Sequence, residues 1–269
     1  IDWIMEQMES DGLDNVRGDM VMVPHWVRGE ESLEMTLPRP RSLPMLGLGG
    51  SIATPVGGIR AEVLVVSSFD ELERRADEAQ GKIVLFDVPF TNYGATVQYR
   101  SQGAIAAARA GAAASIIRSV TPYSQQTPHT GNMEYADGVR RIPHAAITVE
   151  DAEMLHRMQD RGERIELLLK MNAQMLPDAP SRNVMAEIIG SEFPNEVIVL
   201  GGHIDSWDVG QGAMDDAGGV VAAWEAVRLM KELGLRPRRT VRVVGWTSEE
   251  NGGPGGPEYA RMHAHEDHV

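Results

Sequence analysis

The C-terminal third of the chain is organised by two short apolar runs with the pattern of buried strands. The runs VIVL, at 197–200, and VRVVGW, at 241–246, are mostly apolar and rich in valine, which favours strands covered on both faces. A third such run, NVMAEIIG, occupies 183–190, and a helical spacing of apolar residues covers about 218–233. This alternation predicts an α/β sheet whose central strands are joined by a helix.

Residues 60–171 repeat the alternation on a smaller scale. Strand-like runs at 62–66 (EVLVV) and 82–88 (KIVLFDV) are separated by a helical pattern. Ser68 and Glu71 stand three residues apart at the start of that pattern, the spacing of a capping box. Strands alternating with helices through short connections predict a small α/β domain of its own.

The titratable residues of this middle stretch suggest no chemistry, because no nucleophile is paired with a base. We interpret His129 and His144 as loop or structural residues and Asp87 as the end of a strand.

The N-terminal residues predict a helix end followed by two extended stretches, NVRGDMVMVPHW and SLEMTL, which alternate like edge strands. Pro24 fits an edge better than a sheet centre. Residues 38–58 are rich in proline and glycine, which indicates a crossing between units. If the N-terminal stretch returns to the C-terminal sheet, the middle of the chain is an insertion. We therefore expect three segments, at 1–45, 46–176 and 177–269.

Composition narrows the range of partners. The 269-residue chain carries a formal net charge of -14, which argues against nucleic acid or an anionic membrane surface as a partner. It contains no cysteine, so disulfides and thiolate metal ligands are excluded. No apolar run is long enough to span a bilayer, and no signal peptide is visible in the sequence.

Metal-binding residue types follow both buried strands. His203 and Asp205 come directly after the first strand, and Glu249 and Glu250 after the second. Asp215 stands between the strands, in the sequence MDDAGG just before the helix. Because ligands of open α/β sheets gather at the carboxyl ends of the strands, we expect these side chains to converge.

The residue types suit a zinc site with two ions. Imidazole and carboxylate groups are zinc ligands, and neighbouring zinc ions need a bridging carboxylate, which either Asp215 or Asp216 could supply. One of the adjacent residues Glu249 and Glu250 could bind metal while the other serves as general base. Asp205, two residues beyond His203, could orient the imidazole.

At these residues the chain resembles a known family. GGHIDSWD, GAMDDAGG and WTSEENGG are similar to the three successive metal-site motifs of the M28 zinc peptidases, and HIDSWDVGQGAMDDAGG is most similar to their carboxypeptidase Q-like subgroup. Upstream stretches such as PMLGLGGSIATP and IPHAAITVEDAEML resemble the same subgroup and its protease-associated domain. The resemblance implies part of the family's α/β/α sandwich with a mixed sheet, carrying an inserted protease-associated α/β domain.

The resemblance also implies a role for each residue. His203 and Glu250 would each bind one of two zinc ions, Asp215 would bridge them, and Glu249 would be the general base. Asp205 would orient the imidazole, and Asp216 would cap the helix. A peptide substrate, a homodimer and a secreted or periplasmic location are implied in the same way.

The family requires one further Asp ligand and one further His ligand downstream. The chain reaches Val269 before either is expected, so the resemblance implies a C-terminally truncated member whose remaining ligands lie beyond this residue. We interpret His263, His265 and His268 as exposed polar residues rather than as substitutes.

The sequence therefore predicts a zinc-dependent exopeptidase that hydrolyses dipeptides or short peptides. One alternative is a catalytically inactive fragment or homologue that serves as an interaction or dimerisation module. Another is a related metal-dependent amidohydrolase with a different substrate.

Overall fold

The computed structural model describes residues 1–269 and divides into two compact units. Unit 1 comprises Ile1–His25 and Pro177–Val269, and unit 2 comprises Trp26–Leu176. The chain thus leaves unit 1 and later returns to it, so the middle of the sequence is an insertion, as the N-terminal pattern suggests.

Unit 1 is built on a five-stranded mixed sheet in the order β1-β10-β12-β11-β13. Its strands are β1 (Asp14–Val27), β10 (Gln174–Ile188), β11 (Phe193–His203), β12 (Arg239–Trp246) and β13 (Asp267–His268). β12 runs parallel to β11 and antiparallel to β10. The edge position of β1 agrees with the prediction from Pro24, because a proline cannot donate to a neighbouring strand.

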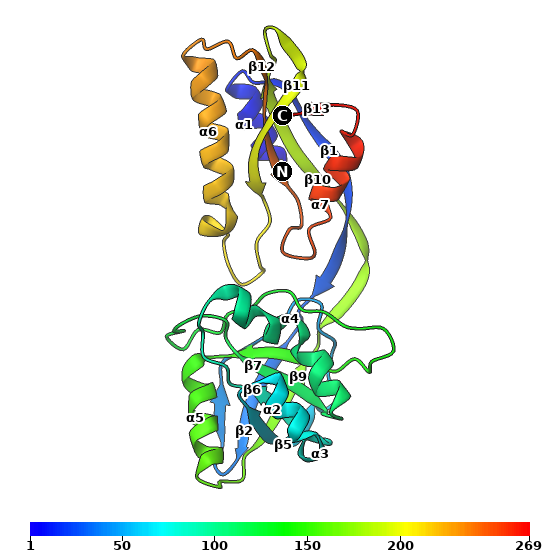
Figure 1. Ribbon diagram of the computed structural model, residues 1–269, viewed down its shortest axis with the longest axis vertical. Coiled ribbons are helices and arrows are strands. Elements are labelled where there is room, and N and C mark those ends of the chain that lie inside the picture. Colours follow the sequence, from blue (N-terminus) through cyan, green and yellow to red (C-terminus); the bar gives the residue numbers. More distant parts are fainter. The chain divides into compact units, whose positions relative to one another are not determined.

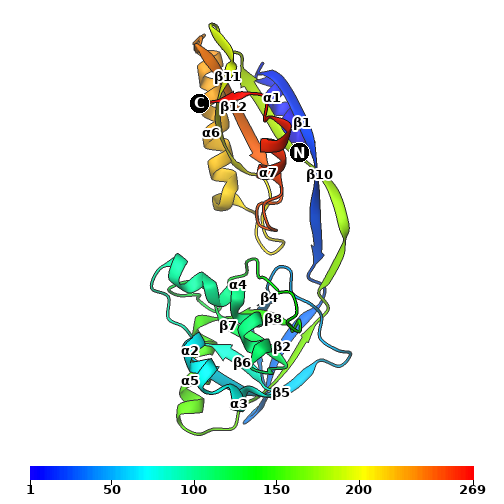
Figure 2. The ribbon, with the colours of Figure 1, turned by 45° about the vertical axis from the view of Figure 1, so that its right-hand side comes forward.

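Helices cover both faces of this sheet (Figures 1 and 2). α1 (Asp2–Ser10) and α6 (Gly218–Glu232) bury apolar side chains against one face, and α7 (Gly255–Met262) packs on the other. Met8 and Val227 meet Val243 in the first of these cores. Tyr259 meets Val244 in the second. The expected α/β/α layering is therefore present.

The two central strands end together. In the parallel pair of β11 and β12, Ile198 lies opposite Val241 and His203 lies opposite Trp246. The residues that follow His203 and Trp246 consequently leave the sheet at the same edge, which is where the sequence predicts a site.

Unit 2 contains an eight-stranded mixed sheet in the order β3-β2-β9-β5-β6-β7-β8-β4. Its strands are β2 (Glu31–Leu37), β3 (Arg41–Leu43), β4 (Met45–Gly47), β5 (Ile59–Val66), β6 (Ile83–Phe86), β7 (Ala114–Arg118), β8 (His144–Ile147) and β9 (Glu166–Met171). β5, β6, β7 and β8 are parallel neighbours. They bury continuous apolar runs, as parallel strands covered on both faces do.

The helices of unit 2 are α2 (Phe69–Arg74), α3 (Ala76–Ala79), α4 (Tyr93–Arg109) and α5 (Val149–Asp160). The predicted cap is present, because the Ser68 hydroxyl accepts a hydrogen bond from the Glu71 amide at 3.0 Å. The Glu71 carboxylate accepts from the Ser67 amide, one residue earlier than a capping box requires. No helix of the chain combines the length and the apolar character needed to cross a membrane.

Three expectations for the N-terminal region differ from the structure. The stretch SLEMTL forms β2, which pairs with β3 and β9 and is not an edge strand. Residues 38–58 contribute β3 and β4 rather than only a crossing. The first division falls after His25, not at residue 45, because β2, β3 and β4 hydrogen-bond into the sheet of unit 2.

Candidate metal centre

The candidate site lies in unit 1, where β11 and β12 end. Two glycines let the strands and the following loop approach closely at this point. A Cβ on Gly201 would lie 2.0 Å from the Val244 carbonyl oxygen, and one on Gly245 would lie 2.6 Å from Cγ2 of Ile204. Both distances are far below van der Waals contact. A side chain at Gly201 would therefore push β11 away from β12, and one at Gly245 would push away the loop that follows His203.

His203 is held through both ring nitrogens. Its Nε2 lies 2.9 Å from Oδ1 of Asp215 and 3.9 Å from Oε2 of Glu249. Its Nδ1 lies 3.0 Å from the backbone oxygen of Asp205 and 3.5 Å from the carboxylate of the same residue. The predicted orienting contact therefore comes chiefly from the Asp205 carbonyl, which fixes the ring with Nε2 directed at Asp215.

The charges around His203 favour a cation. Burial alone would lower the pKa of His203, but the Asp215 hydrogen bond, the Asp205 carbonyl and the negative charges of Asp205 and Glu249 outweigh it and raise this pKa. The imidazole side chain is only 11% exposed. The site is thus a partly buried place with a surplus of negative charge.

The Asp205 carboxylate also contacts the loop that follows β12. Oδ1 accepts a hydrogen bond from the Glu249 amide at 3.0 Å, and Oδ2 accepts one from the Glu250 amide at 3.1 Å. One side chain after β11 therefore fixes the backbone of both glutamates after β12. This contact was not predicted, since spacing along the chain gives no sign of it.

The two adjacent glutamates have different surroundings. The Glu249 side chain is 59% exposed, whereas Glu250 is partly buried and hydrogen-bonded by Trp207. Burial raises the pKa of Glu250, and the negative charges of Asp215 and Glu249 raise it further, against the Trp207 hydrogen bond and His203. Ser248, just before the pair, has a φ of 60°, a left-handed conformation that non-glycine residues adopt mainly where the surrounding structure imposes it.

Asn183 is a residue of the site that was not predicted from the sequence. This fully buried side chain on β10 accepts a hydrogen bond from the Thr247 amide at 3.0 Å and donates one to the Gly255 carbonyl at 2.8 Å. It therefore holds both ends of the loop that bears Glu249 and Glu250. A polar amide at the start of the mostly apolar run NVMAEIIG is the signal that could have identified it.

The adjacent residues Asp215 and Asp216, joined by a cis peptide bond, point to different partners. Asp215 contacts His203 and has a side chain that is 79% exposed. Asp216 accepts hydrogen bonds from the backbone amides of His203 and Gly219. The structure thus places Asp215, and not Asp216, beside the imidazole.

The donor chemistry fits zinc, although these residues do not by themselves surround an ion. An imidazole nitrogen and carboxylate oxygens are zinc ligands, and burial together with the neighbouring carboxylates raises the pKa of Glu250. No group of three or more such side chains converges on one point in the structure. A pocket of about 330 Å³, lined in part by His203, Asp216 and Glu249, adjoins the cluster.

Other titratable groups have structural partners. In unit 2, His144 is fully buried and hydrogen-bonded to Ser115, and Asp87 is paired with Arg118 and His156. Burial lowers the pKa of His144 to about 4, so the ring is neutral at neutral pH.

The expectation that His263 is an exposed residue is wrong. His263 is 6% exposed and lies between Asp19 and Glu266, at 2.8 Å and 3.0 Å. It is buried because α7 packs it against the sheet. Its ring nitrogens contact the carboxylates of Asp19 and Glu266.

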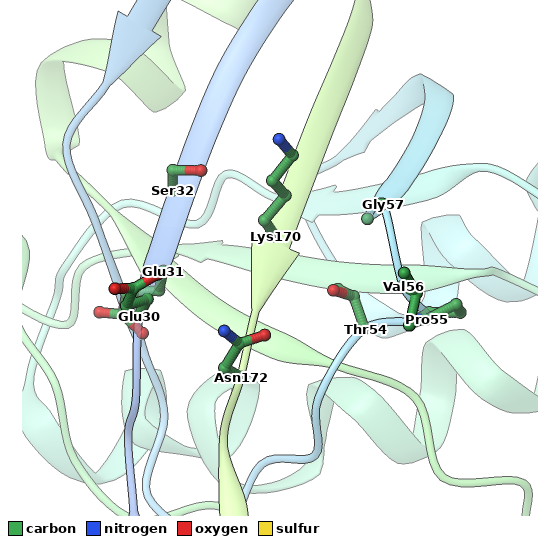
Figure 3. Close-up of a pocket in the computed structure, with 10 residues that line it drawn as sticks. Glu30, Glu31, Ser32, Thr54, Pro55, Val56, Gly57, Lys170 and Asn172 are labelled. Carbon is green, nitrogen blue, oxygen red and sulfur yellow. The ribbon is translucent and has the colours of Figure 1, made fainter.

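A larger pocket, of about 730 Å³, lies in unit 2 and is open to solvent (Figure 3). Its lining comes from the start of β2, the end of β9 and the loop before β5. It holds Lys170 and two glutamates but no histidine, and Glu31 is hydrogen-bonded to the Gly47 amide. It therefore lacks the residues for a second centre of the same kind.

Fold and site together define the class of the protein. Unit 1 is a mixed α/β/α sandwich with imidazole and carboxylate groups at the carboxyl ends of two parallel strands, and it carries an inserted α/β unit. Metal-dependent hydrolases commonly place their ligands in such an arrangement.

Comparison with known families gives the particular group. Residues 183–269 match the model of peptidase family M28, and residues 58–155 match the PA domain. The chain is 56% identical over 263 residues to carboxypeptidase Q of Bos taurus and 57% identical over 258 residues to that of Homo sapiens. The chain belongs to peptidase family M28.

The relatives are longer. The alignment with the Bos taurus protein covers 98% of this chain and 56% of that protein, so the chain spans a little over half the length of its relative. Among solved structures, a peptidase M28 precursor from Shewanella amazonensis SB2B superposes with a TM-score of 0.95 at 37% identity, covering 98% of this chain and 62% of that one. A zinc aminopeptidase from Bacillus subtilis shares the fold, with a TM-score of 0.70 at 23% identity.

Proposed function

We propose that the chain contributes to a zinc-dependent exopeptidase that hydrolyses dipeptides or short peptides. The observation that carries the proposal is the contact of 2.9 Å between His203 Nε2 and Asp215 Oδ1, with a glutamate 3.9 Å away on the neighbouring strand end. Membership of family M28 and the similarity to carboxypeptidase Q support a peptide substrate.

His203, Asp215 and Glu250 are the residues we assign to zinc, with Asp215 as the bridge between two ions. Zinc, when bound, lowers the pKa of water and polarises a carbonyl group. The Asp215 carboxylate is exposed enough to be reached by two ions, whereas Glu250 is partly buried and has a raised pKa. Binding a cation would lower that pKa again and keep Glu250 ionised.

Glu249 is the residue we assign to proton transfer. Its carboxylate is exposed on the side of the pocket, while its backbone amide is fixed by Asp205. In this mechanism the carboxylate accepts a proton from the attacking water and delivers it to the leaving amine nitrogen. Asp205 and Asn183 hold the loop that carries it in place.

The remaining assignments also rest on the family resemblance. We infer that the protein acts in a secreted or periplasmic compartment and forms a homodimer, with unit 2 as its PA domain. Light scattering on the purified protein tests the dimer directly, and a monomer at working concentrations would contradict it.

Hydrolysis of a dipeptide panel tests the proposed function. The assay should use this chain and, in parallel, the longest product of its gene, each loaded with zinc. We expect activity that a chelator removes, and a loss of about 10²-fold or more in kcat in Glu249→Gln with zinc content unchanged. Glu192→Gln is the matched control, since Glu192 is a glutamate of similar exposure in a surface ion pair. An inactive, metal-free but folded product would contradict the proposal and favour an interaction module.

A further inference from the structure

The Asp216 carboxylate connects the end of β11 to the start of α6. Its Oδ1 accepts a hydrogen bond from the Gly219 amide at 3.1 Å, which is an ordinary cap of the helix. Its Oδ2 accepts a second hydrogen bond, at 3.2 Å, from the amide of His203, thirteen residues away. Capping the helix does not require this second bond.

Two glycines make room for this carboxylate. A Cβ on Gly202 would lie 2.1 Å from Asp216 Oδ2, and a Cβ on Gly219 would lie 2.2 Å from Oδ1. Neither glycine has the positive φ that would itself favour glycine. What glycine provides at both positions is therefore space, and the space is occupied by the Asp216 side chain.

Asp216 is linked to both His203 and Asp215, two of the proposed zinc ligands. It is the chain neighbour of Asp215, and it holds the backbone amide of His203, whose ring contacts Asp215. The turn that carries Asp215 is exposed to solvent. The position of this turn relative to β11 therefore depends on few contacts.

We propose that Asp216 is a positioning residue that sets the distance between the zinc ligands His203 and Asp215, and that Gly202 and Gly219 are small in order to admit it. The inference rests on the proposed function, because it requires His203 and Asp215 to be zinc ligands. Asp216 touches neither substrate nor metal in this account. It acts through the backbone of one ligand and through its peptide bond to the other.

Asp216→Ser separates this role from helix capping. Serine is a good helix cap, so the bond to the Gly219 amide can be kept, but its shorter side chain cannot also reach the His203 amide. We expect a free energy of unfolding of the metal-free protein near that of the wild type. We expect zinc affinity to fall by about 10- to 100-fold, the usual effect of losing a group that orients a ligand. Hydrogen exchange at the His203 amide should become faster.

Gly219→Ala gives an independent test, with Gly218→Ala as its control. Alanine favours a helix over glycine by about 1 kcal/mol, so Gly218→Ala should keep or raise stability. In Gly219→Ala this gain is offset by loss of the Asp216 cap, which costs about 1 kcal/mol, so its stability should stay near that of the wild type. A Cβ on Gly218 would meet only the Ala213 carbonyl oxygen, at 3.4 Å. Zinc affinity, measured by competition with a chelating dye, should therefore fall only in Gly219→Ala.

The outcomes distinguish this inference from the proposed function. If the wild type binds zinc and both Asp216→Ser and Gly219→Ala bind it equally well, the positioning role is wrong while the zinc peptidase stands. If the wild type binds no zinc under any condition, the proposed function fails, and the inference fails with it. Unchanged exchange at the His203 amide in Asp216→Ser would contradict the hydrogen bond itself.

Discussion

At the scale of single residues, Asp205 links the two strand ends of the site. Its carbonyl oxygen holds the imidazole of His203, and its two carboxylate oxygens hold the consecutive amides of Glu249 and Glu250. One residue thus fixes a proposed ligand, the proposed base and a second proposed ligand relative to one another.

Asp205→Asn tests this linkage. An amide side chain has one accepting oxygen, so one of the two backbone amides loses its partner. We expect zinc affinity to fall by about 10- to 100-fold, together with a fall in kcat, while far-UV circular dichroism stays unchanged. Asp137→Asn changes an exposed carboxylate in unit 2 and should have no effect. Equal zinc affinity in the two variants would contradict the linkage.

At this scale the sequence predicted which residues gather but not all their contacts. Two apolar strands followed at once by His203 and by Glu249 indicate a shared edge, because parallel strands end together. The contacts of Asp205 with two amides, and of Asp216 with His203, depend on how the loops fold back. Such contacts join residues that are distant in the chain, and no local pattern encodes them.

At the scale of elements, the loop between β12 and α7 is held at its ends by Asn183. Asn183→Ala would leave the buried amide of Thr247 and the carbonyl of Gly255 without this partner. Denaturant unfolding should show a loss of about 1–3 kcal/mol, the cost of unsatisfied buried polar groups, and zinc affinity should fall as well. Asn251→Ala, in the middle of the same loop, is the control. A stability equal to that of the wild type would contradict this role.

The C-terminal residues are held by a buried ion-pair network around Arg242. Burial would raise the pKa of Glu266, but its hydrogen bonds to Arg242 and His263 lower it from 4.5 to about 2. Because the folded-state pKa is depressed, the ionised carboxylate stabilises the fold above pH 4.5, and this stabilisation is lost as the pH falls from 4.5 towards 2.

Glu266→Gln measures this contribution. The shift corresponds to roughly 3 kcal/mol, so the variant should be less stable at pH 7 by up to about that amount. Its free energy of unfolding should also depend less on pH between 4.5 and 2 than that of the wild type. Parallel unfolding curves at pH 7, 4.5 and 3 provide the comparison. Identical pH dependence in the two proteins would exclude a depressed pKa for Glu266.

The burial of His263 shows a limit of sequence reasoning at this scale. A tail with three histidines and several acids has the composition of an exposed surface. The helix α7 nevertheless directs His263 towards Asp19 on the distant strand β1. Only the pairing of β1 with β10 brings that partner near.

At the scale of the whole molecule, each unit has its own apolar core. The alternation of strands and helices was sufficient to predict an α/β sandwich interrupted by an α/β insertion. It predicted β2 as a strand but not its place inside a sheet. It did not predict β3 and β4, because short strands in a stretch rich in proline and glycine carry little periodic signal. The N-terminal boundary differs for the same reason.

The central claim is that His203, Asp215 and Glu250 bind zinc while Glu249 moves protons. Zinc per chain, determined by elemental analysis of the longest gene product after dialysis against zinc-free buffer, tests it most directly. We predict about two zinc ions in the wild type and in Glu249→Gln, and fewer in His203→Ala and in Asp215→Ala. A wild type without zinc, or an Asp215→Ala variant that retains as much zinc as the wild type, would contradict the account.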